Sequence, residues 1–506
     1  MGVPVLGVAV AAVAVAFALL YWYFTATFDY WRRKGVPFLP PEPFFGNMRE
    51  MTLLRISQAE LLQALYHRLE GVPFAGVFQS RRPALLLRSP ALVKAFLVKD
   101  FAHFAHRDMK LDERRDPLTA NLFTLGGPRW RALRARLTPT FTSGKMKMMF
   151  VLMEECAANL VQSLGEPAAR AEQVEMKETL AQYATDVIGS CAFGLQINSL
   201  GDPDCEFRRM GKKMFEPTLA SALRRFTLIF LPTLAKVLNV SLIGGDVTRF
   251  FRAAVRETVA LRERHGVLRH DFLHLLLQLR AQGAHDAFEL TDNLLAAQVF
   301  VFFMAGFETT STTMSFALHE LAVNPDVQAR LQEEVDAALQ ETDGRVTYDA
   351  VMKMEYLDKV IQETLRKYPP VSTLARGCTA PYRIPGTDVT LEKGTRVLVP
   401  VFALHRDPAY YPEPERFDPE RFSPEQKAQR PPFTYLPFGE GPRICIGMRF
   451  GLLQVKTGLA ALLARYSFEA CERTQEPPRL DPKALVTAAE GGAWLRVRAR
   501  CPSAAP

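Results

Sequence analysis

The residues best placed to do chemistry lie in a glycine-rich stretch near the C-terminus, residues 438–447, with the sequence Phe-Gly-Glu-Gly-Pro-Arg-Ile-Cys-Ile-Gly. Its glycines permit positive φ angles and leave little bulk around Cys445, as a backbone pressed against a flat macrocycle would require. Apolar residues then recur with helical spacing from Leu452 to Leu463, so Cys445 should precede a helix N-terminus. A helix dipole there favours a thiolate, and a metal ion would deprotonate the thiol outright. The pattern therefore predicts an axial ligand for a haem iron; a turn with a buried structural cysteine is the alternative.

A second set of reactive side chains lies inside a predicted helix, residues 291–323, which contains no proline and only one glycine. Ala305 and Gly306 leave room for a flat group, while Glu308 and Thr309 offer an acid and an alcohol beside it. A threonine hydroxyl can also bond back to a carbonyl one turn earlier and open the helix locally. This pattern predicts a groove for proton chemistry, and a solvated Thr/Ser face is the alternative.

Two further pairs have the spacing of neighbours on one helix face. Glu363 and Arg366 are three residues apart, and Trp130 and Arg134 are four residues apart. An arginine fits a carboxylate by bidentate hydrogen bonding, so Arg134 is a candidate anion-binding residue. Taken alone, both pairs are also common in ordinary helices.

Taken together, these motifs resemble those of the cytochromes P450, whose iron is held by a cysteine thiolate. The resemblance implies haem b (iron protoporphyrin IX) with Cys445 as the metal ligand. It also implies that Thr309 and Glu308 are catalytic, ordering and relaying protons for O2 activation. The residues that it assigns to the haem environment are Ala305, Trp130, Arg134, Arg376, Phe438, Gly439 and Arg443. Within this set, Trp130 and Arg134 are expected to face one haem propionate and Arg443 the other, with Arg376 as a further candidate.

The same resemblance assigns a structural role to a set of charged residues. Arg421 completes a Glu-x-x-Arg plus Arg network with Glu363 and Arg366, which implies a folding role rather than chemistry. Stretches such as residues 32–37, 116–123 and 137–145 resemble insect members of clan 3, family 6, whose enzymes commonly oxidise plant toxins and insecticides. Ser372 departs from the proline that relatives often carry, which affects the inference of any particular substrate.

The expected fold is mainly α-helical with a small β region, that of a cytochrome P450 with an N-terminal transmembrane helix. Strands are expected at residues 74–78, 84–87 and 395–401. Phe302, Phe303 and Phe307 are candidates for apolar pocket walls, or for plain core. Residues 224–232 fit a membrane-surface contact as well as a buried helix end.

The N-terminus predicts an anchor. Val3 to Phe24 are 22 consecutive uncharged residues, enough to cross a hydrocarbon layer of about 30 Å, and the run exceeds a signal-peptide core. Basic residues 32–34 follow directly, so the positive-inside rule predicts a cytosolic catalytic body. We therefore divide the chain into an anchor (1–24), a basic, proline-rich hinge (25–45) and a haem-thiolate catalytic domain (46–506). The expected location is the endoplasmic reticulum membrane, with a single N-terminal pass.

Composition excludes several classes. The net charge is a modest +8, and basic residues are scattered without interleaved aromatics, which argues against nucleic acid and fits an anionic membrane lipid surface. The seven cysteines are odd in number and contain no Cys-x-x-Cys pair, so neither a disulfide framework nor a structural zinc site is expected.

The predicted activity is insertion of one oxygen atom from O2 into a small lipophilic substrate. No dinucleotide-binding Gly-x-Gly-x-x-Gly follows a strand, so electrons should come from NADPH through a separate cytochrome P450 reductase, with cytochrome b5 as a second partner. The substrate is expected to be a xenobiotic. Three alternatives stay open: oxidation of an endogenous lipid or hormone, a reductase-independent isomerase or dehydratase, and a non-catalytic haem sensor.

Overall fold

A computed structural model describes residues 2–109, 112–215, 218, 220, 223–224, 227–228, 232–266, 269–283 and 289–500. It divides into two compact units, each assembled from separated stretches of chain. Unit 1 contains residues 1–108, 371–412 and 431–443; unit 2 contains residues 109–370, 413–430 and 444–506. The predicted membrane-surface segment, residues 224–232, falls largely outside the described residues.

Unit 1 is built on a four-stranded sheet with the strand order β1-β2-β7-β4. β2 runs antiparallel to β1 and parallel to β7, and β4 runs antiparallel to β7. The first two strands match the predicted ones; β7 is shorter than expected because Val401 already begins a helix. The strands and helices of unit 1 are α1 (Gly2–Thr25), α2 (Tyr30–Arg33), α3 (Arg49–Thr52), α4 (Gln58–Arg68), β1 (Phe74–Gln79), β2 (Arg82–Leu87), α5 (Pro90–Lys94), η1 (Ala95–Lys99), η2 (Phe101–His103), β4 (Leu374–Gly377), β5 (Tyr382–Arg383), β6 (Thr390–Leu391), β7 (Arg396–Val399), α19 (Val401–Leu404) and η7 (Gly441–Arg443).

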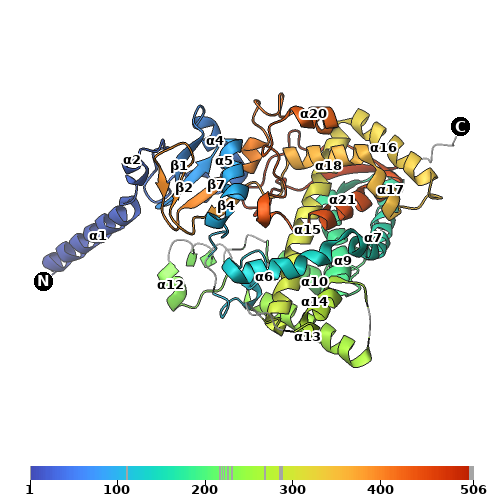
Figure 1. The fold of residues 1–506 in the computed structure, drawn as a ribbon, viewed down its shortest axis with the longest axis horizontal. Helices are drawn as coiled ribbons and strands as arrows, with labels where there is room; N and C mark the ends of the chain where they lie inside the picture. The colour runs from blue at the N-terminus through green and yellow to red at the C-terminus, as the bar shows by residue number, and fades with distance from the viewer. Residues whose placement is uncertain are drawn as a thin grey trace. The chain divides into compact units, whose positions relative to one another are not determined.

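The first helix, α1, has the character of a membrane anchor. From Leu6 to Thr25 it has a mean hydropathy of 2.1, and none of this span is buried in the protein (Figure 1). Where α1 ends it contacts the sheet region: the Arg81 guanidinium lies 3.9 Å from the Tyr23 ring centre, and the Phe24 and Phe44 rings are 5.1 Å apart. The anchor thus ends on unit 1 itself.

The first part of the predicted hinge, residues 25–45, packs onto the sheet of unit 1. Residues 30–33 form the short helix α2, and the Trp31 side chain is wholly buried. Its indole nitrogen donates a hydrogen bond to the Val77 carbonyl at 3.2 Å. A side chain at Gly76 would overlap the indole ring, so the sheet has left space for it. A single large apolar side chain therefore joins this segment to the core.

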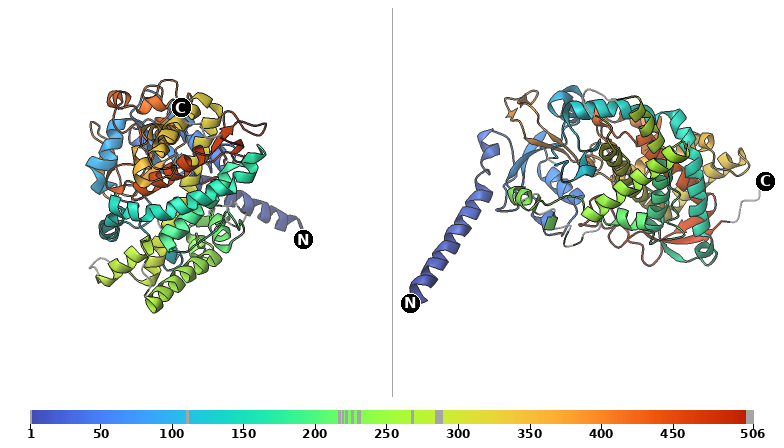
Figure 2. Two further views of the ribbon diagram at one scale, coloured as in Figure 1. Left: turned by 90° about the vertical axis from the view of Figure 1, so that its right-hand side faces the viewer. Right: turned by 90° about the horizontal axis from the view of Figure 1, so that it is seen from below.

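Unit 2 is a helical assembly with one three-stranded sheet of order β3-β9-β8. The long helix α15 packs against α9, and α21 packs against α7 (Figures 1 and 2). The helices and strands of unit 2 are η3 (Pro117–Thr119), α6 (Gly127–Leu137), η4 (Thr138–Phe141), α7 (Ser143–Ser163), α8 (Gly165–Ala169), β3 (Gln173–Glu175), α9 (Met176–Ile188), η5 (Gly189–Phe193), α10 (Glu206–Lys212), α12 (Pro232–Val237), α13 (Gly245–His265), α14 (Phe272–Ala281), α15 (Asp292–Val323), α16 (Pro325–Gln340), α17 (Tyr348–Lys353), α18 (Glu355–Lys367), η6 (Pro419–Phe422), α20 (Pro424–Gln429), α21 (Met448–Leu463), β8 (Tyr466–Glu469) and β9 (Trp494–Ala499).

The central helix α15 has the limits that its sequence predicts. The Thr291 hydroxyl caps its first turn by accepting from the Leu294 backbone N–H at 3.3 Å, and Pro325 lies just past its end. Although α15 is long and apolar enough to span a membrane, most of its apolar stretch is buried within the protein. It is a core helix, as the short apolar run of residues 294–307 predicts.

Candidate active site

The glycine-rich stretch crosses from unit 1 to unit 2 between Arg443 and Ile444. In unit 1, Gly439 and Gly441 have φ angles of +73° and +74°, as predicted. A side chain at Gly441 would overlap the Leu97 carbonyl, so glycine is required there for two reasons. Gly439 is buried and Phe438 is half-buried.

Arg443 is positioned by backbone contacts within unit 1. Its side chain is 3% exposed, and its Nε donates to the Ala105 carbonyl at 2.9 Å. Its own carbonyl accepts from Arg107 Nη2 at 3.4 Å. The bond to Ala105 holds the Arg443 guanidinium, and the bond from Arg107 holds the Arg443 backbone, two residues before Cys445.

Arg376 on β4 is a buried cation with no carboxylate among the groups that shift its pKa. It is 2% exposed, and burial lowers its pKa to about 10. Its Nη1 donates to the Ala375 carbonyl at 2.9 Å, but within the described part of the chain its Nε has no acceptor. A buried guanidinium of this kind is costly unless an anion joins it. Arg376 therefore fits the carboxylate of a bound group.

In unit 2, Cys445 has an exposed side chain and α21 begins three residues later, at Met448. The prediction of a cysteine just before a helix N-terminus is confirmed. Of the three glycines around Cys445, Gly447 does not use the positive φ that glycine permits, because its φ is −89°. A Cβ there would lie 4.0 Å from the Phe141 ring, which is ordinary van der Waals contact.

Trp130 and Arg134 share one side of α6, as their spacing predicts. Trp130 is 4% exposed and Arg134 is half-buried. Burial lowers the pKa of Arg134, and a thiolate at Cys445 would oppose that shift, because its negative charge favours the protonated guanidinium. This brings a cation from α6 near the predicted iron ligand.

On α15, neighbouring residues serve different sides of the helix. Ala305 is exposed, whereas a side chain at Gly306 would overlap Ile188 of α9. The two small residues were predicted to make room together for a flat group, but Gly306 is small because α9 packs there. Ala305 keeps an open surface.

Thr309 and Thr310 show the same division. The Thr309 hydroxyl donates to the Ala305 carbonyl at 2.6 Å, the back-bond that a mid-helix threonine is expected to make. The Thr310 hydroxyl is buried and donates to Oε1 of Gln454 on α21 at 3.3 Å. Thr310 thus joins two helices, and Thr309 lies on the same side as Ala305, one turn along.

The acid beside Thr309 is held by a residue that the sequence did not single out. Glu308 Oε1 lies 2.8 Å from Nζ of Lys177 on α9, and that ammonium also donates to the Ser311 hydroxyl at 2.7 Å. Glu308 and Lys177 are 17% and 20% exposed in their side chains. No local pattern pointed to Lys177, because the two partners are 131 positions apart in the chain.

The charged network predicted around Glu363 is present in unit 2. Arg366 Nε and Nη2 donate to the two Glu363 carboxylate oxygens at 2.6 and 2.8 Å, and both side chains are completely buried. Arg421 Nε lies 3.4 Å from Glu363 Oε1, and the Asp418 backbone N–H donates to the same oxygen at 3.0 Å. Burial raises the pKa of Glu363, while Arg366 opposes that rise.

Of the three phenylalanines proposed as pocket walls, Phe303 and Phe307 are core residues, whereas Phe302 is half-buried and packs against Phe272 with ring centres 4.2 Å apart. Phe303 and Phe307 are at most 1% exposed, with ring centres 5.1 Å apart. Phe303 also contacts Phe251 of α13 at 5.1 Å. These contacts account for both phenylalanines without a ligand.

The family model described as Cytochrome P450 matches residues 36–496. The chain belongs to the cytochrome P450 family. It is 43% identical over 502 residues to cytochrome P450 6k1 of Blattella germanica, covering 96% of this chain and 95% of that protein. It is 41% identical over 503 residues to probable cytochrome P450 6a14 of Drosophila melanogaster, covering 96% and 99%. Cytochrome P450 9e2 of Blattella germanica is 40% identical over 522 residues, covering 96% and 97%.

Membership of the P450 family assigns this chain a haem group, the use of O2 and an oxidoreductase monooxygenase activity. Taken unit by unit, the residues suit such a group: in unit 2 an exposed cysteine precedes α21, and in unit 1 the buried Arg376 has no acceptor for its Nε among the described residues. The apolar α1 is consistent with an N-terminal membrane anchor.

Proposed function

We propose that this P450 is a membrane-anchored monooxygenase of lipophilic xenobiotics that receives electrons from an NADPH-dependent cytochrome P450 reductase. The observation that carries the proposal is the position of Cys445, exposed just ahead of α21 and within electrostatic reach of Arg134. The xenobiotic class rests on similarity to the insect family 6 and 9 proteins. The choice of xenobiotics as the substrate class is the most specific part of this proposal.

Bound haem supplies an iron centre that activates O2 for insertion of one oxygen atom into the substrate. The Cys445 thiolate would hold the iron and donate electron density to it. Arg134, Arg443 and Arg376 would bind haem carboxylates by charge-assisted hydrogen bonds, with the Trp130 indole N–H beside Arg134. Phe438, Gly439 and Ala305 would leave the close approach that a flat macrocycle needs.

Thr309 and Glu308 would take part in proton delivery. In the structure the Thr309 proton is engaged by the Ala305 carbonyl, which leaves the hydroxyl oxygen as an acceptor. A water molecule held on that oxygen would be the immediate proton donor. Glu308, paired with Lys177, would resupply the proton after exchange with solvent.

The proposed setting is the endoplasmic reticulum membrane with the catalytic units in the cytosol. Residues 32–34 are basic and follow α1 directly, which supports that orientation. The reductase would dock on the cytosolic surface, and cytochrome b5 would be a second electron donor. In this setting residues 1–24 act as the anchor and 46–506 as the catalytic domain.

Replacement of Cys445 by alanine tests the ligand. The variant should lose the thiolate signature in the carbon-monoxide difference spectrum of the reduced protein, because Cys445 is the one cysteine in a glycine-rich stretch before a helix. An unchanged spectrum would remove Cys445 as the ligand. Replacement of Cys471, a half-buried cysteine elsewhere in unit 2, is the control.

Thr309 and Thr310 form a matched pair for the proton role. Thr309→Ala should keep haem and substrate binding while product formed per NADPH falls and hydrogen peroxide is released, since a general acid step contributes roughly 10²- to 10⁴-fold. Thr310→Ala, which loses the bond to Gln454, should lower stability without changing that ratio. Equal product ratios in wild type and Thr309→Ala would contradict the proton role. Reductase-dependent product formation also separates a monooxygenase from an isomerase or a sensor.

A further inference from the structure

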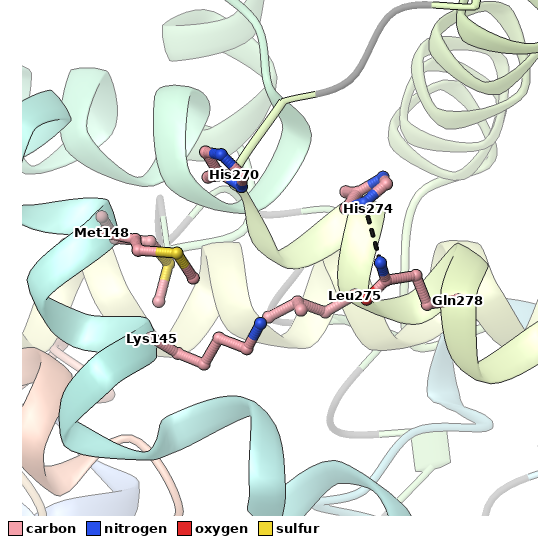
Figure 3. A pocket seen from close by; sticks show the side chains of 7 residues that line it. Lys145, Met148, His270, His274, Leu275 and Gln278 are labelled. Atoms are coloured by element: carbon pink, nitrogen blue, oxygen red, sulfur yellow. Dashed lines mark hydrogen bonds between the residues drawn. The ribbon is translucent and has the colours of Figure 1, made fainter.

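A small cavity lies between the first turns of α7 and α14 in unit 2, apart from every residue assigned to the haem (Figure 3). Its volume is about 130 Å³. An apolar cavity of about 150 Å³ takes up one benzene molecule, so this space suits a single six-membered ring. The size therefore limits any ligand to a compact one.

The cavity has an apolar lining on both helices. Met148 and Met149 come from α7, and Leu275 comes from α14. Met149 is 3% exposed, whereas the Met148 side chain is exposed at the cavity mouth. Thioethers are polarisable and contact aromatic rings favourably. These side chains would enclose a ring better than a simple inorganic ion.

Polar groups around the cavity are donors. Lys145 from α7 and His270 and His274 beside or on α14 surround it, and none of the described residues that line it is acidic. The nearest carboxylate in sequence, Asp271, is fully buried, with Arg262 Nη1 donating to it at 2.9 Å. That carboxylate is already neutralised and does not offset the Lys145 charge.

The contact between His274 and Gln278 defines a further donor. The Gln278 amide nitrogen lies 3.0 Å from His274 Nε2, and an amide nitrogen can only donate (Figure 3). With the Gln278 amide nitrogen as the donor, the neutral His274 ring would carry its proton on Nδ1; with the amide turned over, it would carry it on Nε2, so the ring offers one N–H in either case. The first two turns of α7, which have no acidic residue and no side-chain cap, also contribute the positive end of their helix dipole, whereas the first turn of α14 is capped by the Asp271 carboxylate.

We propose that this cavity, the α7–α14 pocket lined by Lys145, Met148, Met149, His274 and Leu275, binds a small aromatic carboxylate. The ring would lie between the methionines and Leu275. The carboxylate would accept hydrogen bonds from the Lys145 ammonium and from an imidazole N–H. A neutral arene would leave the cationic rim unused, and an inorganic anion would leave the apolar lining unused.

The test uses para-fluorobenzoate as the probe and fluorine NMR line broadening on the full-length, haem-loaded protein, with an azole saturating the haem site. Saturable binding at one site per chain is expected. Lys145→Met should weaken binding about 10-fold or more, the size of one lost charge-assisted hydrogen bond. Lys147→Met is the control, because Lys147 on the same helix instead contacts Asp349 at 2.9 Å.

A second variant fills the space instead of removing charge. Leu275→Trp should abolish binding while the carbon-monoxide spectrum stays unchanged, because Leu275 has no assigned role at the haem. The proposal is overturned by absence of saturable binding up to about 10 mM probe, a limit that corresponds to negligible affinity. It is also overturned if both variants bind as wild type does, or if para-fluorobenzyl alcohol, which lacks the charge, binds as tightly.

Discussion

Two buried arginines in this P450, Arg366 and Arg376, differ in which group balances their charge. Arg366 in unit 2 is completely buried and is bound through two hydrogen bonds by Glu363, which is completely buried as well. Arg376 in unit 1 is almost as buried, but no carboxylate contributes to its pKa, which burial lowers to about 10. The counter-charge of Arg366 is a carboxylate of the protein. Arg376 has no such carboxylate among the groups that shift its pKa, and we propose that an anionic group of a ligand pairs with it.

The comparison teaches how to separate folding residues from binding residues when both are buried and charged. A buried ion pair adds little net stability, but breaking it leaves an unpaired charge and is strongly destabilising. A buried charge without a partner already carries that cost in the folded protein. Removing such an unpaired charge should therefore stabilise the folded protein and weaken the binding of the ligand.

The largest expected effect is on Glu363. Glu363→Ala should destabilise the protein by about 3 to 5 kcal/mol, because it leaves Arg366 buried without its carboxylate. Urea unfolding measures the change. The exposed pair of Asp29 and Arg33, 3.1 Å apart, is the control, and Asp29→Ala should cost at most about 0.5 kcal/mol. A similar cost for both variants would remove the distinction between paired buried charges and surface ones.

Arg376 should respond in the opposite sense. Arg376→Met should leave the haem-free protein as stable as wild type or more so, while haem affinity falls about 10- to 100-fold, as expected for a lost hydrogen bond to a charged group. Haem titration and urea unfolding give the two values. Arg82→Met is the control, since that arginine is 55% exposed and pairs with Asp108 at 3.0 Å. Loss of stability without loss of haem affinity would make Arg376 a folding residue like Arg366.

A buried base gives the smallest effect and depends on pH. Burial lowers the pKa of His319, which is 5% exposed, below its usual value of about 6.5. Below about pH 6.5 the unfolded chain therefore binds a proton at His319 that the folded protein does not bind. As a result, the free energy of unfolding should fall as the pH drops, by at most about 1.4 kcal/mol per pH unit. His319→Gln should reduce this slope between pH 7.5 and 5.5 in urea unfolding. An identical slope in the variant would contradict the assignment.

Local patterns predicted much of this molecule. The extent of α15 followed from a stretch that lacks proline and contains a single glycine, and the strands at 74–78 and 84–87 were also predicted from the sequence. The P450 fold is confirmed by the family match over residues 36–496. These features depend on neighbours in sequence or on a long, specific motif set.

What the sequence did not predict depends on partners far along the chain. Lys177 binds Glu308 across 131 positions, and Gly306 is small because of Ile188 on another helix. Trp31 is buried under the sheet although its surroundings are proline-rich and polar. The roles of Thr309, Glu308 and the arginines toward haem stay predictions, because geometry alone does not test them.

The contacts at the end of α1 have a consequence for how this enzyme meets its substrates. Only residues 26–29 separate α1 from α2, a reach of about 14 Å even if fully extended. The Thr27 hydroxyl donates to the Arg81 carbonyl at 2.5 Å, and Trp31 is buried just beyond it. With α1 in a bilayer, this short connection would hold the rest of unit 1 close to the lipid surface. Lipophilic molecules concentrated in the bilayer would then reach the protein by diffusing in two dimensions, and their concentration in lipid, more than in water, would set the rate at which the protein encounters them.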